Sequence, residues 1–139
     1  GYNGKNGSTH RFLELRSYSG TVTHGPIFVY NNTIANCWGT ITRGDTSVYW
    51  SADSVVANNL VYNTGSGGIG WTPTTVFNNI NATSSPFVAG SYDILATSIA
   101  RNAGKAIPNV GTHTFNIDAN GNTRGADGTW DVGAVEYKQ

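Results

Sequence analysis

The sequence has little charge and almost no sulfur. Eight Lys and Arg balance eight Asp and Glu, so the formal net charge is zero, and there is one cysteine and no methionine. A neutral chain lacks the positive field that attracts nucleic acids or anionic membranes, so neither is expected as a partner. The single Cys37 excludes an internal disulfide and cannot by itself make a metal site. No apolar run approaches the roughly 20 residues of a membrane-spanning helix, so we expect no membrane span.

The residues that are abundant favour short strands and tight turns. The chain has 18 glycines, together with many Asn, Thr and Ser and frequent β-branched and aromatic residues. Turn signals such as His24-Gly25-Pro26 and Arg43-Gly44-Asp45 separate runs of roughly four to seven residues, which are too short for ordinary helices. We therefore expect an all-β protein, and the length of 139 residues predicts a single domain, 1–139.

A frame of two β-type runs around an Asn-Asn pair occurs three times. The copies span residues 29–36, 56–63 and 76–83, and their starts lie 27 and 20 residues apart. Periods of about 20–50 residues indicate a solenoid, in which one repeat buries its apolar face against the next. Residues 11–83 are therefore predicted to form coils, about four in all at this period.

The Asn pairs are predicted to occupy the bends between strands. Asn tolerates the positive φ of a sharp bend better than most residues. The pairs are Asn31-Asn32, Asn58-Asn59 and Asn78-Asn79, and stacking them would let each amide bond to the next. The alternative is that Asn-Asn merely forms turns in an Asn-rich chain, but three copies in register favour an asparagine ladder.

The end of the chain carries the more specific pattern. It contains Ser85-Pro86-Phe87, Tyr92 to Leu95, Ser98 to Gly104, Asp118 to Arg124, and Trp130-Asp131-Val132-Gly133-Ala134-Val135-Glu136-Tyr137. These segments resemble the closing part of secreted bacterial β-helix proteins of the pectate-lyase-like superfamily, with a choice-of-anchor Q type ending. The chain departs from that pattern in lacking a proline after Ser98 and in having Asn102 where the family has Asp.

The resemblance implies a right-handed parallel β-helix closed by an irregular C-terminal cap over residues 84–139. Apolar residues should fill the coil interior and the contact with the cap. The expected core is Ile27, Val29, Ile34, Val56, Leu60, Val61, Val76, Ile80, Ile94, Leu95, Ile99 and Val132.

The resemblance also implies that coils are missing at the N-terminal side. Proteins of this kind commonly have more coils than this chain provides, so we expect it to be a fragment of a longer protein. An uncapped solenoid end exposes apolar surface and strand edges. The N-terminal coil face is therefore expected to be covered by another chain or by missing parent residues.

Asp118, Asn120 and Asn122 place oxygen-bearing side chains at alternate positions around Gly121. This spacing is that of the first half of a calcium loop, so a Ca²⁺ site is one prediction. No bidentate Glu follows at the required distance. The alternative is that Asp118 and Asn120 cap a turn, with Arg124 bonding back to Asp118 or Asp131.

The densest acidic group is Asp127, Asp131 and Glu136. Two carboxylates about 5–9 Å apart could hydrolyse a glycosidic bond. However, Asp131 and Glu136 fall in the closing segment that the resemblance implies is structural. We therefore expect Asp131 to hold a turn.

Candidate carbohydrate-binding residues lie in the repeat region. Arg43 and Asp45 are the nearest match to the charged residues of β-helix lyases, although a solvated turn pair is the simpler interpretation. Trp50 and Trp71 have small polar neighbours that would leave their rings open to stack on sugars. The sequence shows no complete catalytic set.

Three Thr-x-Thr pairs allow another function. Residues 21–23, 40–42 and 72–74 have this pattern, which in some β-helices forms an ice-binding plane. Their spacing of 19 and 32 residues is irregular, so a flat ice-binding surface is the less favoured alternative.

The resemblance implies a secreted or cell-surface bacterial protein that acts on or binds polysaccharide by lyase, hydrolase or epimerase chemistry. This segment is expected to be mainly structural within it. The rival hypothesis is a non-catalytic surface or adhesion module.

Overall fold

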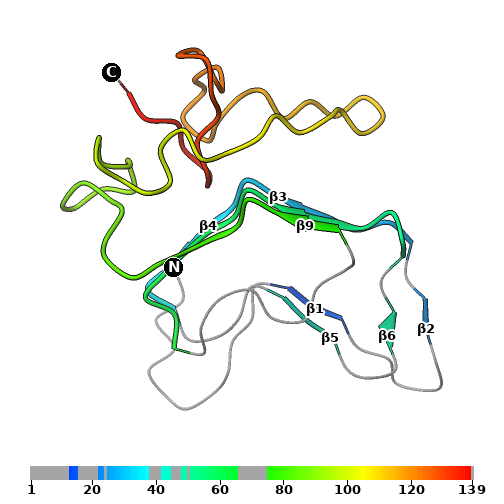
Figure 1. Ribbon diagram of the computed structural model, residues 1–139. Coiled ribbons are helices and arrows are strands. Elements are labelled where there is room, and N and C mark those ends of the chain that lie inside the picture. The colour runs from blue at the N-terminus through cyan, green and yellow to red at the C-terminus, as the bar shows by residue number, and fades with distance from the viewer. Residues whose placement is uncertain are drawn as a thin grey trace.

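The computed structural model describes residues 13–15, 22–23, 25–37, 42–44, 48–49, 51–65 and 75–138. Within these ranges the protein is all-β, as the composition predicts, and contains strands without a helix (Figure 1). Accordingly, no helix in the described ranges is long and apolar enough to cross a membrane.

Among the described residues the strands pair in parallel, and each pairs with a strand of a neighbouring repeat. Four sheets result: β1–β5, β2–β6, β3–β7–β9 and β4–β8–β10. The strands are β1 (Leu13–Leu15), β2 (Val22–Thr23), β3 (Phe28–Tyr30), β4 (Thr33–Ala35), β5 (Thr42–Gly44), β6 (Val48–Tyr49), β7 (Val55–Ala57), β8 (Leu60–Tyr62), β9 (Thr75–Phe77) and β10 (Ile80–Ala82).

The three repeated frames lie side by side in register. Val29 of β3 pairs with Val56 of β7, which pairs with Val76 of β9. In the next sheet, Ile34 of β4 and Val61 of β8 pair in the same way. Val29, Val56, Ile34 and Val61 are buried together, with Ile27 and Cys37 packed against them. Parallel pairing of the copies, predicted from their spacing, is confirmed.

The asparagine ladder is present. The Asn32 amide donates to Asn59 Oδ1 at 2.9 Å, and the Asn59 amide donates to Asn79 Oδ1 at 2.7 Å. The preceding residue of each pair takes positive φ, with 53° at Asn31, 54° at Asn58 and 50° at Asn78. Asn suits these bends because its side chain tolerates the left-handed region and its amide then bonds to the neighbouring repeat.

Residues 84–138 form an irregular segment, called here the C-terminal segment, which lies against one side of the strand stack (Figure 1). Leu60 of β8 packs with Val132 and other residues of this segment, while the adjacent Val61 faces the opposite cluster. The central strand of the sheet β4–β8–β10 is therefore buried on both faces. Its outer cluster comprises Leu60, Ala82, Phe87, Ile94, Ala100 and Val132.

Close contact with the sheet requires glycine at position 133. Its φ is 109°, and a Cβ there would lie 2.6 Å from Thr33 Oγ1 and 3.1 Å from Leu60 Cβ. The next residue, Ala134, donates its N–H to Thr33 Oγ1 at 2.8 Å. The Asn58 side chain adds bonds to the backbone of Lys105 at 2.7 and 3.1 Å. These contacts hold the segment on the side of the sheet rather than over its end.

The position of this segment explains which core predictions hold. The predicted core residues that are buried are Val29, Ile34, Val56, Leu60, Val61, Ile94 and Val132, and those partly buried are Ile27, Ile80 and Leu95. Val76 and Ile99 were wrongly predicted, since they are 41% and 58% exposed. Val76 lies on an edge strand, β9, so no further described strand covers its side chain.

Candidate functional site

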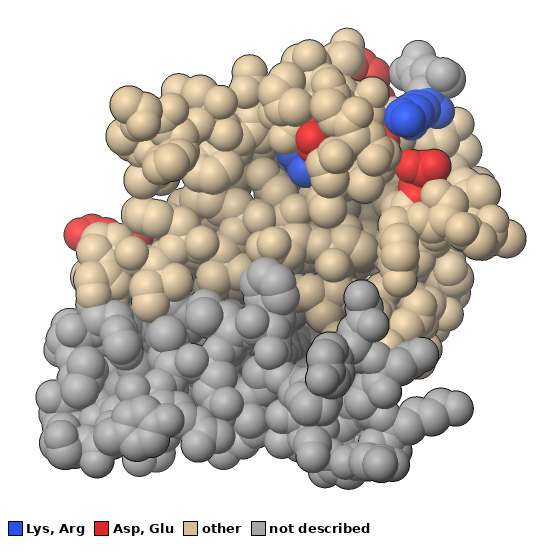
Figure 2. Space-filling model, turned by 180° about the vertical axis from the view of Figure 1, so that it is seen from behind, with Lys and Arg blue, Asp and Glu red and all other residues tan. Residues whose placement is uncertain are grey.

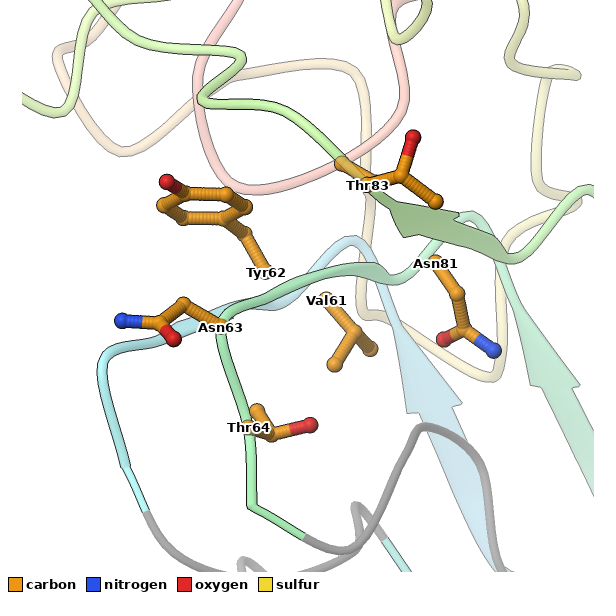
Figure 3. Close-up of a pocket in the computed structure, with 7 residues that line it drawn as sticks. Val61, Tyr62, Asn63, Thr64, Asn81 and Thr83 are labelled. Carbon is orange, nitrogen blue, oxygen red and sulfur yellow. The ribbon is translucent and has the colours of Figure 1, made fainter.

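A cleft of about 350 Å³ opens where the last strand ends (Figure 3). Its lining comes from β8 and β10 and the residues that follow each strand. The lining residues are Val61, Tyr62, Asn63, Thr64, Asn81, Ala82 and Thr83. They offer two amides, three hydroxyl groups and two aliphatic side chains.

The cleft forms because the chain leaves the sheet after β10. Ala82 pairs with Tyr62, so Thr83 follows β10 as Asn63 follows β8. Beyond Thr83 the chain turns away into the C-terminal segment (Figure 1). No described strand therefore continues beside residues 63–65 on the β10 side.

On the opposite side of β8, the same residues keep their partners. The Asn63 amide donates to Asn36 Oδ1 at 2.8 Å, and the Gly65 N–H donates to the Cys37 carbonyl at 3.2 Å. Asn63 and Asn36 form a second Asn corner, with φ of 50° and 54°. This corner fixes one wall of the cleft and leaves Asn63 Oδ1 without a donor among the described residues.

Asn81 is the polar exception in an apolar row. It pairs with Val61, which pairs with Ile34, and both of those residues are buried. Asn81 is exposed and makes no side-chain hydrogen bond to another described residue. Val61 and Asn81 point to one side of the strands, and Tyr62 and Thr83 to the other (Figure 3). The amide at the last position of the row is thus available to a ligand.

Tyr62 supplies the aromatic ring of the cleft. It is half-buried, and its ring meets the Phe87 ring edge-on, with centroids 6.0 Å apart and planes at 79°. Packing on the outer cluster fixes the ring plane, since a rotating ring would lose this contact. The ring lies on the same side of the strands as Thr83, so a sugar that stacks its C–H face on the ring would lie beside that hydroxyl group (Figure 3).

None of the carbohydrate-binding residues predicted from the sequence is among the described residues that line this cleft. Asp45, Trp50 and Trp71 lie outside the described residues. Arg43 lies in β5, where its backbone pairs with Glu14, and no lining residue of the cleft comes from that strand. Asn81 was not predicted from the sequence. Alignment of the three frames would have indicated it, because Asn81 occupies the position that Ile34 and Val61 hold in the other two frames.

The Thr-x-Thr pairs do not form adjacent rows in the described strands. Thr23 in β2 pairs with Tyr49, and Thr42 in β5 pairs with Leu13. Thr23 and Thr42 thus lie in different sheets, and the other threonines of the three pairs lie outside the described residues, so the ice-binding alternative is not carried further.

N–H groups, rather than an open ligand shell, surround the carboxylate of Asp118. Its Oδ1 accepts the backbone N–H groups of Asn120 and Asn122 at 2.8 and 2.7 Å. Its Oδ2 accepts the Asn122 amide at 2.9 Å and the Glu136 N–H at 2.8 Å. The described residues contain no group of three or more His, Cys, Asp or Glu that could hold a metal. This geometry favours the turn-capping alternative over Ca²⁺.

Arg124 does not bond to Asp118 or Asp131 as that alternative proposed. Its Nη1 donates to Glu136 Oε1 at 2.9 Å, and its Nη2 donates to the Gly133 and Ala134 carbonyls at 3.0 Å. Both ionic side chains are buried, at 2% and 7% exposure. Because the pair is buried within the C-terminal segment, removing either partner would leave the other charge uncompensated.

Two carboxylates of the acidic group, those of Asp131 and Glu136, are also engaged in hydrogen bonds. Asp131 accepts the N–H groups of Asn102 and Tyr137 at 2.6 and 2.5 Å, so it holds a turn as expected. Glu136 additionally accepts the N–H groups of Gly125 and Asp131, each at 3.0 Å. Asp131 and Glu136 are buried and their carboxylates are occupied by these donors, whereas Asp127 is exposed and lines a second cleft together with Glu136.

Asp118 gives a testable pH dependence. Burial raises its pKa, but the hydrogen bonds from Asn122, Glu136 and Asn120 outweigh this and leave the pKa below its usual value. A lowered pKa contributes stability above the unfolded pKa of about 4, which is lost as pH falls through the folded pKa. We expect Asp118→Asn to cost stability at pH 6 and this difference to shrink on acidification, as measured by urea unfolding.

The experiment needs a control for the general loss of a carboxylate, and it must allow for the titration of Glu136. Asp127→Asn removes an exposed carboxylate and is the matched control. Burial raises the pKa of Glu136, so this residue contributes stability that is lost as the pH rises. That contribution is present in both the wild type and Asp118→Asn, so it cancels in their difference. A difference between wild type and Asp118→Asn that stays constant from pH 6 to acid would contradict the prediction.

Comparison of the chain with protein-family models, curated proteins and solved structures gave no match.

Proposed function

We propose that this chain is part of a right-handed parallel β-helix protein that binds polysaccharide outside the bacterial cell, and that the segment itself is non-catalytic. The observation that carries the proposal is the uncharged cleft beside Tyr62 at the end of β10. Its amides and hydroxyl groups can both donate and accept hydrogen bonds, as sugar hydroxyl groups require. Lyase, hydrolase or epimerase activity would then belong to other coils of a longer parent.

The strand arrangement supports the β-helix part of the proposal. Strands β1 to β4 are followed by β5 to β8, and each pairs in parallel with the strand four places later. Parallel strands require a crossover connection, and here the connections are the other strands of the same repeat. A solenoid coil visits its sheets in this order. The Asn ladder at the bend between β3 and β4 repeats in β7–β8 and β9–β10.

The engaged carboxylates support a binding role over catalysis. General acid–base chemistry needs a titratable group within hydrogen-bond reach of the ligand. No lining residue of the cleft is titratable near neutral pH. The carboxylates of Asp118, Asp131 and Glu136 accept hydrogen bonds from backbone N–H groups, and Glu136 also accepts one from Arg124.

A screen of soluble oligosaccharides by titration calorimetry tests the proposal on the full chain. We expect binding without turnover, including no activity on polyuronates with or without calcium. Asn81→Ala should weaken binding about 5–10-fold, the worth of one hydrogen bond to the ligand. Tyr62→Phe should have a smaller effect, because the ring remains.

Asn120→Ala is the matched control, since Asn120 is exposed and lies in the C-terminal segment, outside the cleft lining. Unchanged affinity in Asn81→Ala and Tyr62→Phe would place the sugar elsewhere. Recognition of a surface protein but of no oligosaccharide would favour the adhesion module instead.

A further inference from the structure

The cleft lies in a long stretch of sequence without charge. Residues 54–92 contain no Lys, Arg, Asp, Glu or His, and they include β7 to β10 and every lining residue. Most of the described surface in Figure 2 is likewise neither acidic nor basic. The described lining residues can therefore recognise a ligand through hydrogen bonds and apolar contacts but not through ionic groups.

An acidic sugar would fit this site poorly. A uronate carboxylate that enters a cleft loses part of its hydration, and this loss is costly unless a cation or a set of N–H donors replaces the water. The lining offers no Lys, Arg or His. Its donors are neutral amides and hydroxyl groups, and the amide of Asn63 is already bonded to Asn36. Neutral donors bond to a carboxylate more weakly than charged ones do, and they leave its charge uncompensated.

A neutral sugar has the complementary chemistry. Each sugar hydroxyl donates and accepts one or more hydrogen bonds, as do the Asn, Thr and Tyr groups of the lining. Val61 and Ala82 can contact the C–H groups of a sugar ring. The cleft volume of about 350 Å³ is near the lower end for small-molecule sites, so it accommodates a short stretch or an end of a chain.

We infer that this cleft selects uncharged polysaccharide and discriminates against uronate-containing chains. The inference rests on the proposed function, which it narrows to one substrate class. It adds two predictions to that function: the sugar is uncharged, and its affinity does not depend on the salt concentration. Screening acts on charged pairs and leaves neutral hydrogen bonds almost unaffected.

The test uses oligogalacturonides of one length in two forms, fully methyl-esterified and de-esterified, so that the probes differ mainly in charge. Neutral gluco-, xylo- and manno-oligosaccharides complete the panel. We expect the neutral probes to bind at least roughly tenfold more tightly than the de-esterified chain, reflecting the unpaired carboxylates. We also expect the neutral affinity to stay constant between low and high salt.

A charge introduced into the cleft supplies the second arm. Asn81 is exposed, so Asn81→Lys should fold, which circular dichroism checks, and it should raise affinity for the de-esterified chain severalfold. Asn81→Gln keeps the cleft neutral and is its control. Tighter wild-type binding of the de-esterified chain, abolished by Asn81→Ala, would overturn the inference but leave carbohydrate binding standing. Absence of binding to every probe would overturn both.

Discussion

Replacing Asn59 with alanine will destabilise the fold by about 3–5 kcal/mol, the sum of two or three buried polar groups left without partners. Asn59 is fully buried. It accepts from the Asn32 N–H and amide at 3.1 and 2.9 Å. It donates to the carbonyls of Val29 and Ala57 at 2.9 and 3.0 Å, and to Asn79 Oδ1 at 2.7 Å. Removal of one side chain thus breaks the ladder at its centre.

Urea unfolding of the full chain measures this effect, with Asn81→Ala as the matched control. Asn81 is an asparagine in β10, and because its side chain is exposed, its removal should lower the free energy of unfolding by less than about 1 kcal/mol. If both substitutions cost the same, the ladder contributes no more than a surface amide, and its role in specifying the register would be refuted.

Replacing Arg124 with methionine should cost a similar amount, about 3–5 kcal/mol, because it leaves the Glu136 carboxylate buried without its counterion. It also removes the donor to the carbonyls of Gly133 and Ala134 and the guanidinium that lies 5.7 Å from the Trp130 ring centroid. We expect the loss to appear as a lower urea midpoint for the C-terminal segment and the sheet it covers, since both share the outer cluster.

Arg101→Met is the control, because Arg101 also lies over an aromatic ring, 4.3 Å from the Tyr137 centroid, but makes no ion pair with a described residue, so its removal leaves no buried carboxylate without a counterion. The double substitution of Arg124→Met with Glu136→Gln should recover part of the stability, since the second change removes the unpaired charge. Strictly additive losses in the double variant would show that the pair is not coupled.

The Asn-Asn frames determine much of the fold by themselves. Each frame encodes a strand, a bend at positive φ and a second strand, and the amide of one pair bonds to the amide of the aligned pair in the next repeat. Equivalent positions such as Val29 and Val56 therefore become neighbours whatever the length of the connection. Local conformational preference and side-chain pairing agree here, so the sequence predicts parallel, in-register strands.

The position of the C-terminal segment depended on contacts that no local pattern shows. Its irregular backbone has no periodicity, and its docking is decided by the close approach of Gly133 to Leu60 and by the bonds of Asn58 to Lys105. These residues are far apart in sequence. The sequence predicted an irregular segment over residues 84–139 but not where it docks, and Val76, expected in the core, is exposed on β9.

The sequence by itself determined the class of fold, the strand register and the absence of charge from residues 54–92, because these follow from residue type and spacing. Only the tertiary structure decided that Tyr62, Asn63, Asn81 and Thr83 line one cleft, since this depends on where β10 ends and the chain turns away. It also decided that the Glu136 N–H joins the local donors of Asn120 and Asn122 around Asp118. Long-range packing sets both features, and spacing along the chain does not encode it.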